Sequence, residues 1–571
     1  MEQKRFLLAM ILSGLVIFIW QIFFLPPPEE YVDDIDDDAV EQVAQEDDQA
    51  DQEASASVDD APDDVDPSEA QALEAPSEAQ AEAPTIEARR DLIRSGEMVV
   101  ELSNRGAVVV DTRVTSPEQY ARPESQLMRS FEEDAPDLPF SMNFEDGNID
   151  VDPDQLFELV EQESVRAADG KTFKKIVYRH VHPAGHYSVD KIYSLDTGRR
   201  YALQLEVEVK NLLDDDGVRL ASRPILNIIG RDDPDKESNF FDFRPDVLEG
   251  VCHTTDGTER EVFDPEDPPE SFSEHSVMWA GAHTRYFMMA AVPADPAEAC
   301  GFEPAGRDYL RTTIKPASFN ISPGDSWSTS FMLYMGPKHF DILRDNGYEL
   351  QEAVDYGLFT ILARPLRWAL VRLYDITLNW GLAIILLTFI IKTVTWPITG
   401  KAYTNAERMK QIQPVIKEIR EKYENDQQRM TEETMKAFRE NNVSPLGCLP
   451  LLLQMPILYG LFVMIYNSVE LYHASFLWYA DLSAPDPWFI LPIVMGAVMF
   501  VQQKITMSTA ATTNPQMMIV MKVMPIAFTA FMLFLPAGLV LYYLLNLLMG
   551  LGQQFWIKRK FRLAEEAGES I

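Results

Sequence analysis

A long apolar stretch near the C-terminus sets the first limit on the fold. Residues 523–557 form 35 largely apolar residues, interrupted by Pro536-Ala537-Gly538. About 20 apolar residues in a helix are enough to cross a bilayer, and neighbouring Pro and Gly residues mark a turn. The stretch therefore predicts two membrane spans joined by a tight hairpin, and it excludes a single span.

Apolar segments of similar length recur along the chain and predict a polytopic membrane protein. The first, residues 6–25, follows Lys4 and Arg5 and ends in three prolines without a small-x-small cleavage site. This pattern favours a retained N-terminal transmembrane anchor, residues 1–25, over a removed signal peptide. Two of the later segments contain a lysine, Lys504 or Lys522, and each of these side chains must extend to the membrane surface. The six expected spans are 6–25, 379–398, 446–467, 488–506, 516–535 and 537–557.

The positive charges predict the orientation of these spans. Residues 400–443 contain nine Lys or Arg, and a basic cluster follows the last span at 558–562, whereas the loop 469–487 has none. Basic loops stay in the cytoplasm. Both termini are therefore expected in the cytoplasm, together with 400–443 and the tail 558–571, and residues 26–350 are expected in the periplasm of a cell inner membrane.

The expected periplasmic part is strongly acidic. Residues 26–350 hold 72 of the 90 acidic residues and only 28 of the 49 basic ones. Such a surface repels phosphates, so nucleic acid is not an expected partner. Within 29–88 there are 23 acidic residues and no Lys or Arg, a composition that cannot bury enough apolar surface to fold. We therefore interpret 26–90 as a disordered linker.

Residues 91–345 alternate between apolar and polar side chains in short runs. The run Tyr201 to Lys210 puts Leu203, Leu205 and Val207 on one face and charged or amide side chains on the other. Such alternation predicts a half-buried antiparallel strand. Weaker runs occur at 98–102, 107–114, 174–181, 187–195, 223–230 and 328–336. The expected fold of this region is an all-β sandwich.

Two helical patterns lie on either side of the first core span. In 346–376, apolar residues at helical spacing oppose several arginines, which predicts an amphipathic helix along the membrane surface. In 400–443, Met409, Ile412, Ile416, Ile419 and Tyr423 form a coiled-coil seam. A polar break at 424–428 then predicts a cytoplasmic helical hairpin, which serves either as a spacer or as a contact for partners and clients.

Lys392 is the most informative single residue, because it lies inside the expected span 379–398. A buried ammonium there costs about 2.5 kcal/mol or more. Thr388, Thr395 and Thr399 share its helix face, which therefore predicts a wet cavity in the bundle. The alternative is that Lys392 snorkels to the cytoplasmic surface. The last span adds a second polar stripe, formed by Gly538, Tyr542, Asn546 and Gln553, and Gln454 is a lone polar residue in the third span.

Other kinds of site lack support in the sequence. Cys252, Cys300 and Cys448 have no zinc spacing, and pairing of Cys252 with Cys300 stays open against two free buried thiols. There is no nucleotide-binding, dinucleotide-binding or zinc-protease motif. We therefore expect no metal, no cofactor and no catalytic residue. No carboxylate lies in the spans, which counts against an ion-coupled transporter.

Several motifs resemble the YidC membrane insertase family throughout 350–557. They are Asn379-Trp-Gly, the run from Thr388 to Thr399 with Lys392 inside it, Pro445-Leu-Gly, Gln454-Met-Pro-Ile457, Ile490-Leu-Pro-Ile493 and Pro536-Ala-Gly-Leu-Val-Leu-Tyr-Tyr543. The anchor and the large β region resemble the Gram-negative branch of the family. The resemblance implies a β-supersandwich, five spans forming an insertase core at 377–557, and a groove whose cation attracts the polar tail of a substrate.

The resemblance also implies partners and site residues. Expected partners are nascent membrane proteins, the Sec translocon, membrane lipid, and the ribosome or targeting factors at 400–443. Thr388, Met455, Phe531 and Tyr543 match family positions at the groove, whereas the stripe above selects Tyr542. Lys392 stands where the family usually has Arg. Near Cys448 the chain is one Gly shorter than the family pattern. The end of the C-terminal tail is acidic, which argues against a ribosome contact through this tail. A channel and a membrane-anchored carbohydrate enzyme are the competing hypotheses.

Overall fold

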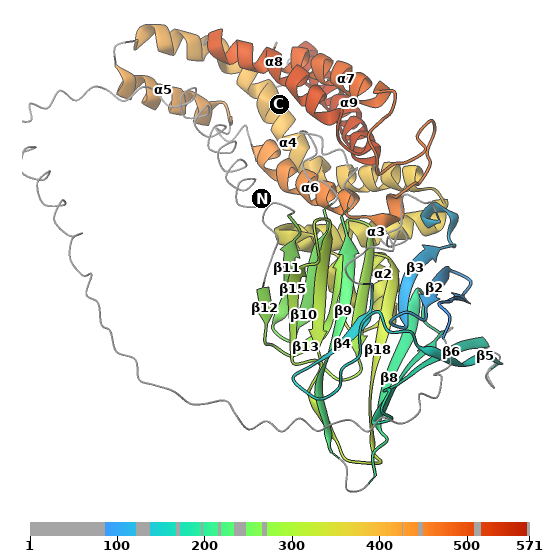
Figure 1. Ribbon diagram of the computed structural model, residues 1–571. Helices are drawn as coiled ribbons and strands as arrows, with labels where there is room; N and C mark the ends of the chain where they lie inside the picture. Colours follow the sequence, from blue (N-terminus) through green and yellow to red (C-terminus); the bar gives the residue numbers. More distant parts are fainter. Residues whose placement is uncertain are drawn as a thin grey trace, which may run out of the picture. The chain divides into compact units, whose positions relative to one another are not determined.

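The computed structural model describes residues 86–121, 138–166, 172–195, 198–214, 218–232, 247–264, 271–424, 426–443, 449–507 and 515–567 (Figure 1). The expected N-terminal anchor, nearly all of the acidic linker, Cys448 and the last four residues of the tail lie outside these residues. The described chain consists of a region of β-strands followed by a region of helices.

The strands form three antiparallel sheets. The nine-stranded sheet has the order β11-β10-β13-β14-β18-β8-β7-β6-β5, the six-stranded sheet has β12-β15-β16-β9-β17 with β4 beside β9, and the small sheet is β1-β2-β3. We call these strands, together with helix α2, the β-domain. Their bounds are β1 Arg90–Arg94, β2 Met98–Ser103, β3 Val108–Val114, β4 Ser141–Glu145, β5 Glu158–Arg166, β6 Thr172–Val181, β7 Tyr187–Ser194, β8 Ala202–Asn211, β9 Leu220–Arg231, β10 Glu249–Thr254, β11 Gly257–Val262, β12 Ser271–Ser273, β13 Val277–His283, β14 Phe287–Pro293, β15 Ala299–Pro304, β16 Tyr309–Lys315, β17 Phe319–Ile321 and β18 Ser326–Pro337.

The expected strands are confirmed, with ends that differ by a few residues. In β8, Leu203, Leu205, Val207 and Val209 are all buried, and the strand pairs with β7 and β18. The sequence analysis missed the strands that lack alternation. In β14, for example, every residue is buried, because this strand lies inside the large sheet and is covered on both faces. Period-two alternation cannot mark such a strand.

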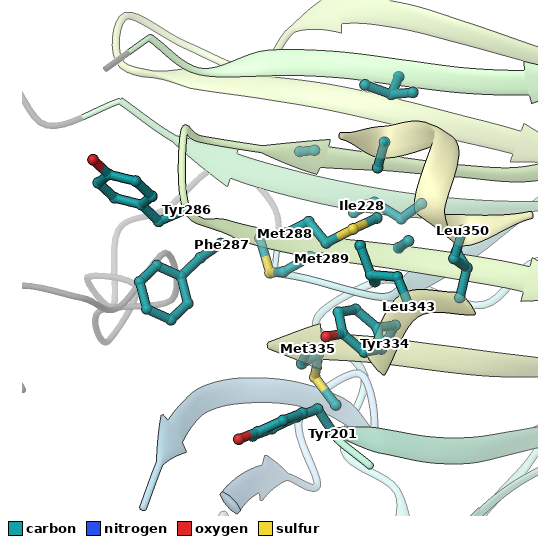
Figure 2. Packing of buried hydrophobic residues seen from close by; sticks show 14 of the residues in the cluster. Tyr201, Ile228, Tyr286, Phe287, Met288, Met289, Tyr334, Met335, Leu343 and Leu350 are labelled. Atoms are coloured by element: carbon teal, nitrogen blue, oxygen red, sulfur yellow. The ribbon is translucent and has the colours of Figure 1, made fainter. Parts of the chain in front are cut away.

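The two larger sheets pack face to face around β13, β14, β9 and β16. Figure 2 shows part of this core, with Met288 and Met289 of β14 near Ile228 of β9 and Leu343 of α2. Cys252 on β10 and Cys300 on β15 form a disulfide, so the open question of their pairing is answered by a bond between the two sheets.

The helical region starts with short turns and then runs through long apolar helices. The helices are α2 Phe340–Asn346, α3 Thr360–Thr377, α4 Trp380–Lys422, α5 Gln427–Glu440, α6 Leu449–Tyr466, α7 Ile490–Met507, α8 Pro515–Met532 and α9 Ala537–Ala567, with 3-10 turns η1 Glu118–Tyr120, η3 Leu350–Ala353, η4 Gly357–Phe359 and η5 Val469–Leu471. Helices α8 and α9 are separate and meet at the predicted turn around Pro536.

Among the described helices, α4 alone is long and apolar enough to cross a membrane by length and composition. Shorter apolar helical stretches occur at Gln454–Tyr466, Ile490–Ile505 and Val523–Met532. The number of six spans therefore stays a prediction. Helix α4 also continues without a break from the expected span into the expected hairpin, with Pro397 and Pro414 inside it, and α5 forms the returning arm.

Candidate functional site

Helix α4 carries the polar face that the sequence predicts. Asn379 caps its first turn by accepting a hydrogen bond from the amide of Leu382. Thr388, Lys392, Thr395 and Thr399 are all buried on one side of this helix, and only 4% of Lys392 is exposed. The hydroxyls of Thr388 and Thr395 donate to backbone carbonyls one turn earlier, as from Thr388 to Ile384 at 2.7 Å. Their hydrogen bonds are thus satisfied within the helix.

The ammonium of Lys392 lies against α9. Its Nζ donates to Oδ1 of Asn546 at 3.1 Å, and Lys392 makes no ion pair with any carboxylate that the structure describes. A Cβ built at Gly550 would lie 3.5 Å from this Nζ, 3.2 Å from the hydroxyl of Tyr403 and 3.8 Å from Nε2 of Gln502. Polar groups from α4 and α7 therefore converge on Gly550 of α9, which makes room for them because it has no side chain.

A second polar contact joins the same two helices further along. Thr399 donates to Oε1 of Gln553 at 3.0 Å, and Nε2 of Gln553 donates to the carbonyl of Trp396 at 2.9 Å. Gln553 is completely buried. Both side-chain atoms of this amide are satisfied, so the contact fixes α9 against α4 next to Pro397.

The remaining predicted residues fall into three places. Gln454 of α6 approaches the hydroxyl of buried Tyr542 at 3.4 Å. Tyr543 points to α8, where its ring lies 5.1 Å from Phe528, which in turn lies 6.2 Å from Phe531. The side chain of Met455 is 55% exposed. The structure thus puts Lys392 in contact with Asn546, buries Thr388 and Thr395 on the same side of α4, and puts Tyr542 and Tyr543 toward different neighbours.

Tyr403 and Gln502 were not predicted as site residues from the sequence. Tyr403 follows Thr399 by four residues, so it continues the stripe of polar residues along α4 and could have been found from helical spacing. Gln502 offered a weaker signal, because the contact of α7 with α9 that brings it near Gly550 depends on the tertiary packing.

The site is suited to binding anionic or polar groups. Its one ammonium is surrounded by hydroxyl and amide groups and is not neutralised by a described carboxylate. No cluster of three or more His, Cys, Asp or Glu side chains that could hold a metal occurs in the described residues. The arrangement can therefore attract negative charge or hydrate a polar segment.

Comparison with known proteins identifies both regions. A family described as "60Kd inner membrane protein" matches residues 372–565, and the "YidC periplasmic domain" matches residues 92–369. The "Membrane protein insertase YidC" of Syntrophus aciditrophicus is 34% identical over 430 residues, which cover 74% of this chain and 76% of that protein.

Two solved structures are also similar. One is a YidC insertase with its first transmembrane domain resolved, with a TM-score of 0.35 at 18% identity, covering 82% of this chain and 93% of that one. The other is a galactose mutarotase-like protein from Lactobacillus casei, with a TM-score of 0.30 at 9% identity, covering 43% of this chain and 100% of that one. At these TM-scores neither structure bears on the assignment. The matches in sequence do, and they establish that the chain belongs to the YidC family of membrane protein insertases.

Proposed function

We propose that the chain inserts membrane proteins through a polar groove centred on Lys392. Insertion of inner-membrane proteins is the function of its family, which is not a class of enzymes. What we propose beyond this family function is the place in the chain, around Lys392, where a client is bound. One observation supports it above the others: the ammonium of Lys392 is buried between α4 and α9 with an uncharged partner, Asn546.

The driving force for insertion is the burial of apolar client surface in lipid. A groove need only shorten the path along which the polar end of a client loses water. A charge that is buried but not neutralised can attract a carboxylate on that polar end. At an effective dielectric constant near 20, two unit charges about 4 Å apart interact by roughly 4 kcal/mol. Lys replaces the usual Arg here, so the bidentate contact of a guanidinium is absent.

The wider arrangement is part of the same proposal. We propose six spans with both termini in the cytoplasm, an N-terminal anchor at 1–25, a linker at 26–90, a periplasmic domain at 91–345, a surface helix at 346–376 and a five-span core at 377–557. Nascent membrane proteins are the clients, and the Sec translocon is the proposed partner of the core. Thr388, Thr395, Gln454, Met455, Phe531, Tyr542 and Tyr543 are proposed to line the groove.

The cytoplasmic arm, formed by the end of α4 and by α5, is the proposed contact for targeting factors or the ribosome. Ile412 and Ile416 of α4 pack with Val443, Met409 and Phe438 into a small core of its own. Val415 and Met435 remain exposed on its surface, 42% and 41% respectively. An arm that is stabilised internally can present such side chains to a partner.

A charge series at Lys392 tests the groove. We expect Lys392→Arg to keep insertion of clients with acidic translocated tails, Lys392→Ala to slow it, and Lys392→Glu to slow it most. Neutral-tailed clients should respond less. Insertion is measured by protease protection of the client tail, and Lys401→Glu is the matched control, since Lys401 is an exposed cation on the same helix. Wild-type rates for folded Ala and Glu variants would contradict the role of the charge.

A further inference from the structure

The segment that follows α6 is buried although it is polar. Ser468 and Glu470 are at most 3% exposed, and Val469 and Leu471 are fully buried. Glu470 lies in the short turn η5, outside the long helices. A buried carboxylate is costly unless a cation and hydrogen bonds compensate it.

Arg367 of α3 provides that compensation. Its Nε and Nη2 donate to Oε1 of Glu470 at 3.0 and 2.8 Å, and Nη2 also contacts Oδ2 of Asp341 on α2 at 2.8 Å. Only 6% of Arg367 is exposed, and its guanidinium lies 4.6 Å from the ring centre of Phe340. One guanidinium thus joins the surface helix, the end of the β-domain and the segment after α6.

The turn between β13 and β14 holds the same segment from another side. Arg285 donates to the hydroxyl of Tyr466, the last residue of α6, and its guanidinium lies 3.9 Å from that ring centre. The ring of Tyr472 lies 4.7 Å from Tyr286 and 5.9 Å from Phe287. We call residues 466–472 with these contacts the junction.

Helix α6 leads directly from the junction to the proposed groove. It ends at Tyr466 and carries Gln454 and Met455 about three turns earlier. Along the way Gly460 packs closely on α3, since a Cβ there would lie 3.1 Å from Cβ of Leu362. Gln454 and Met455 lie in the same helix just before Pro456, so a rotation or shift of the end of α6 at the junction would displace them.

We infer that Arg367 is a positioning residue for insertion, which holds the end of α6 through Glu470 and Asp341 so that Met455 faces the client. This inference rests on the proposed groove. It gives the β-domain a role in aligning a helix of the core.

The charge on Arg367 persists over the whole physiological range. Burial alone would lower its pKa, but Glu470, Tyr356 and Asp341 outweigh burial, and the pKa is raised above its ordinary value. The cation of the junction therefore stays charged at any physiological pH.

Site-specific cross-linking separates positioning from simple stability. A photoreactive amino acid is placed in the full-length protein at Met455 on α6 or at Phe531 on α8, and adducts with a nascent client are counted. We expect Arg367→Met and Glu470→Gln to lower the yield at Met455 at least fivefold and to leave the yield at Phe531 within twofold. Arg367→Lys should show a smaller loss, because lysine keeps the positive charge but lacks the guanidinium that contacts both carboxylates.

Arg372→Met is the matched control. Arg372 lies on the same helix and pairs with Asp375, but its side chain is 65% exposed, so both yields should stay at the wild-type level. Unchanged yield at Met455 in folded Arg367→Met and Glu470→Gln would overturn the inference, and so would an equal loss at both positions. If wild-type protein gives no adduct at either position, the groove itself is wrong and the inference falls with it.

Discussion

Lys191 shows how one buried charge shapes stability in the β-domain. It lies on β7, and its Nζ donates to the carbonyl of Gly106 at 2.6 Å and lies 5.4 Å from the ring centre of Phe157. The side chain is almost fully buried, and burial lowers the pKa of Lys191 from 10.5 to about 7. Lys191 lies on the same face of β7 as the buried Tyr187, Val189 and Tyr193, so the strand pattern puts this lysine among apolar side chains, next to the turn that carries Gly106.

The lowered pKa predicts a pH dependence of stability. Between about pH 7 and pH 10.5 the unfolded chain keeps the proton on Lys191 while the folded protein has lost it. Unfolding then takes up a proton, so raising the pH favours the folded state. Compared with Lys191→Met, wild type should gain about 2 kcal/mol of unfolding free energy between about pH 7 and pH 9.

Denaturant unfolding of the full-length protein at the two pH values measures this gain. Lys210→Met on the neighbouring strand β8 is the control, since Lys210 is partly exposed and should give no such change. If the unfolding free energies of wild type and Lys191→Met differ by the same amount at both pH values, Lys191 stays protonated in the folded protein.

At the scale of elements, α4 marks the limit of what periodicity can predict. The sequence correctly gave a helix in the expected span and helices in the arm, because both have apolar residues at helical spacing. It did not predict that they are one helix of 43 residues, because the apolar span and the charged arm differ in composition and were predicted as separate elements. The buried amide of Gln553 contacts this region from α9, a contact between distant residues that no local pattern contains.

The arm offers a prediction at the same scale. If it contacts partners or clients, photoreactive groups at the exposed positions Val415 and Met435 should give adducts during client synthesis, whereas buried Ile412 should give few. Adducts are detected by a shift of a labelled client on a denaturing gel. Equal, background yields at all three positions, together with good yields at Met455, would reduce the arm to a spacer.

For the whole molecule, the sequence predicted the β region, the helical region and their order, because each has its own hydrophobic period and charge. The junction could not be predicted in this way. Arg367, Glu470 and Asp341 lie apart in the sequence, and each looks like an ordinary surface charge until the fold buries Arg367 with Glu470 and brings partly exposed Asp341 against them. The disulfide between Cys252 and Cys300 likewise depends on two sheets meeting.

This disulfide provides a test of how the whole molecule is oriented. Disulfides persist in oxidising compartments such as the periplasm and are rare in the cytosol. With the β-domain outside, protein denatured without reductant should react with a maleimide at one cysteine, Cys448, and at all three after reduction. Cys448→Ser should abolish the maleimide reaction of the unreduced protein. Three reactive thiols before reduction would contradict the periplasmic location.

The same bond should stabilise the β-domain, because it closes a loop over a sequence separation of 48 residues and so restricts the unfolded chain. In the chain-entropy model, a loop of this length contributes about 4 kcal/mol, and strain can reduce this figure. Replacing both cysteines by serine should therefore lower the unfolding free energy by about 2–4 kcal/mol. In wild type, reductant should produce a similar loss, and it should leave the double variant unchanged. A double variant as stable as wild type would mean that packing between β10 and β15 holds the sheets together without the bond.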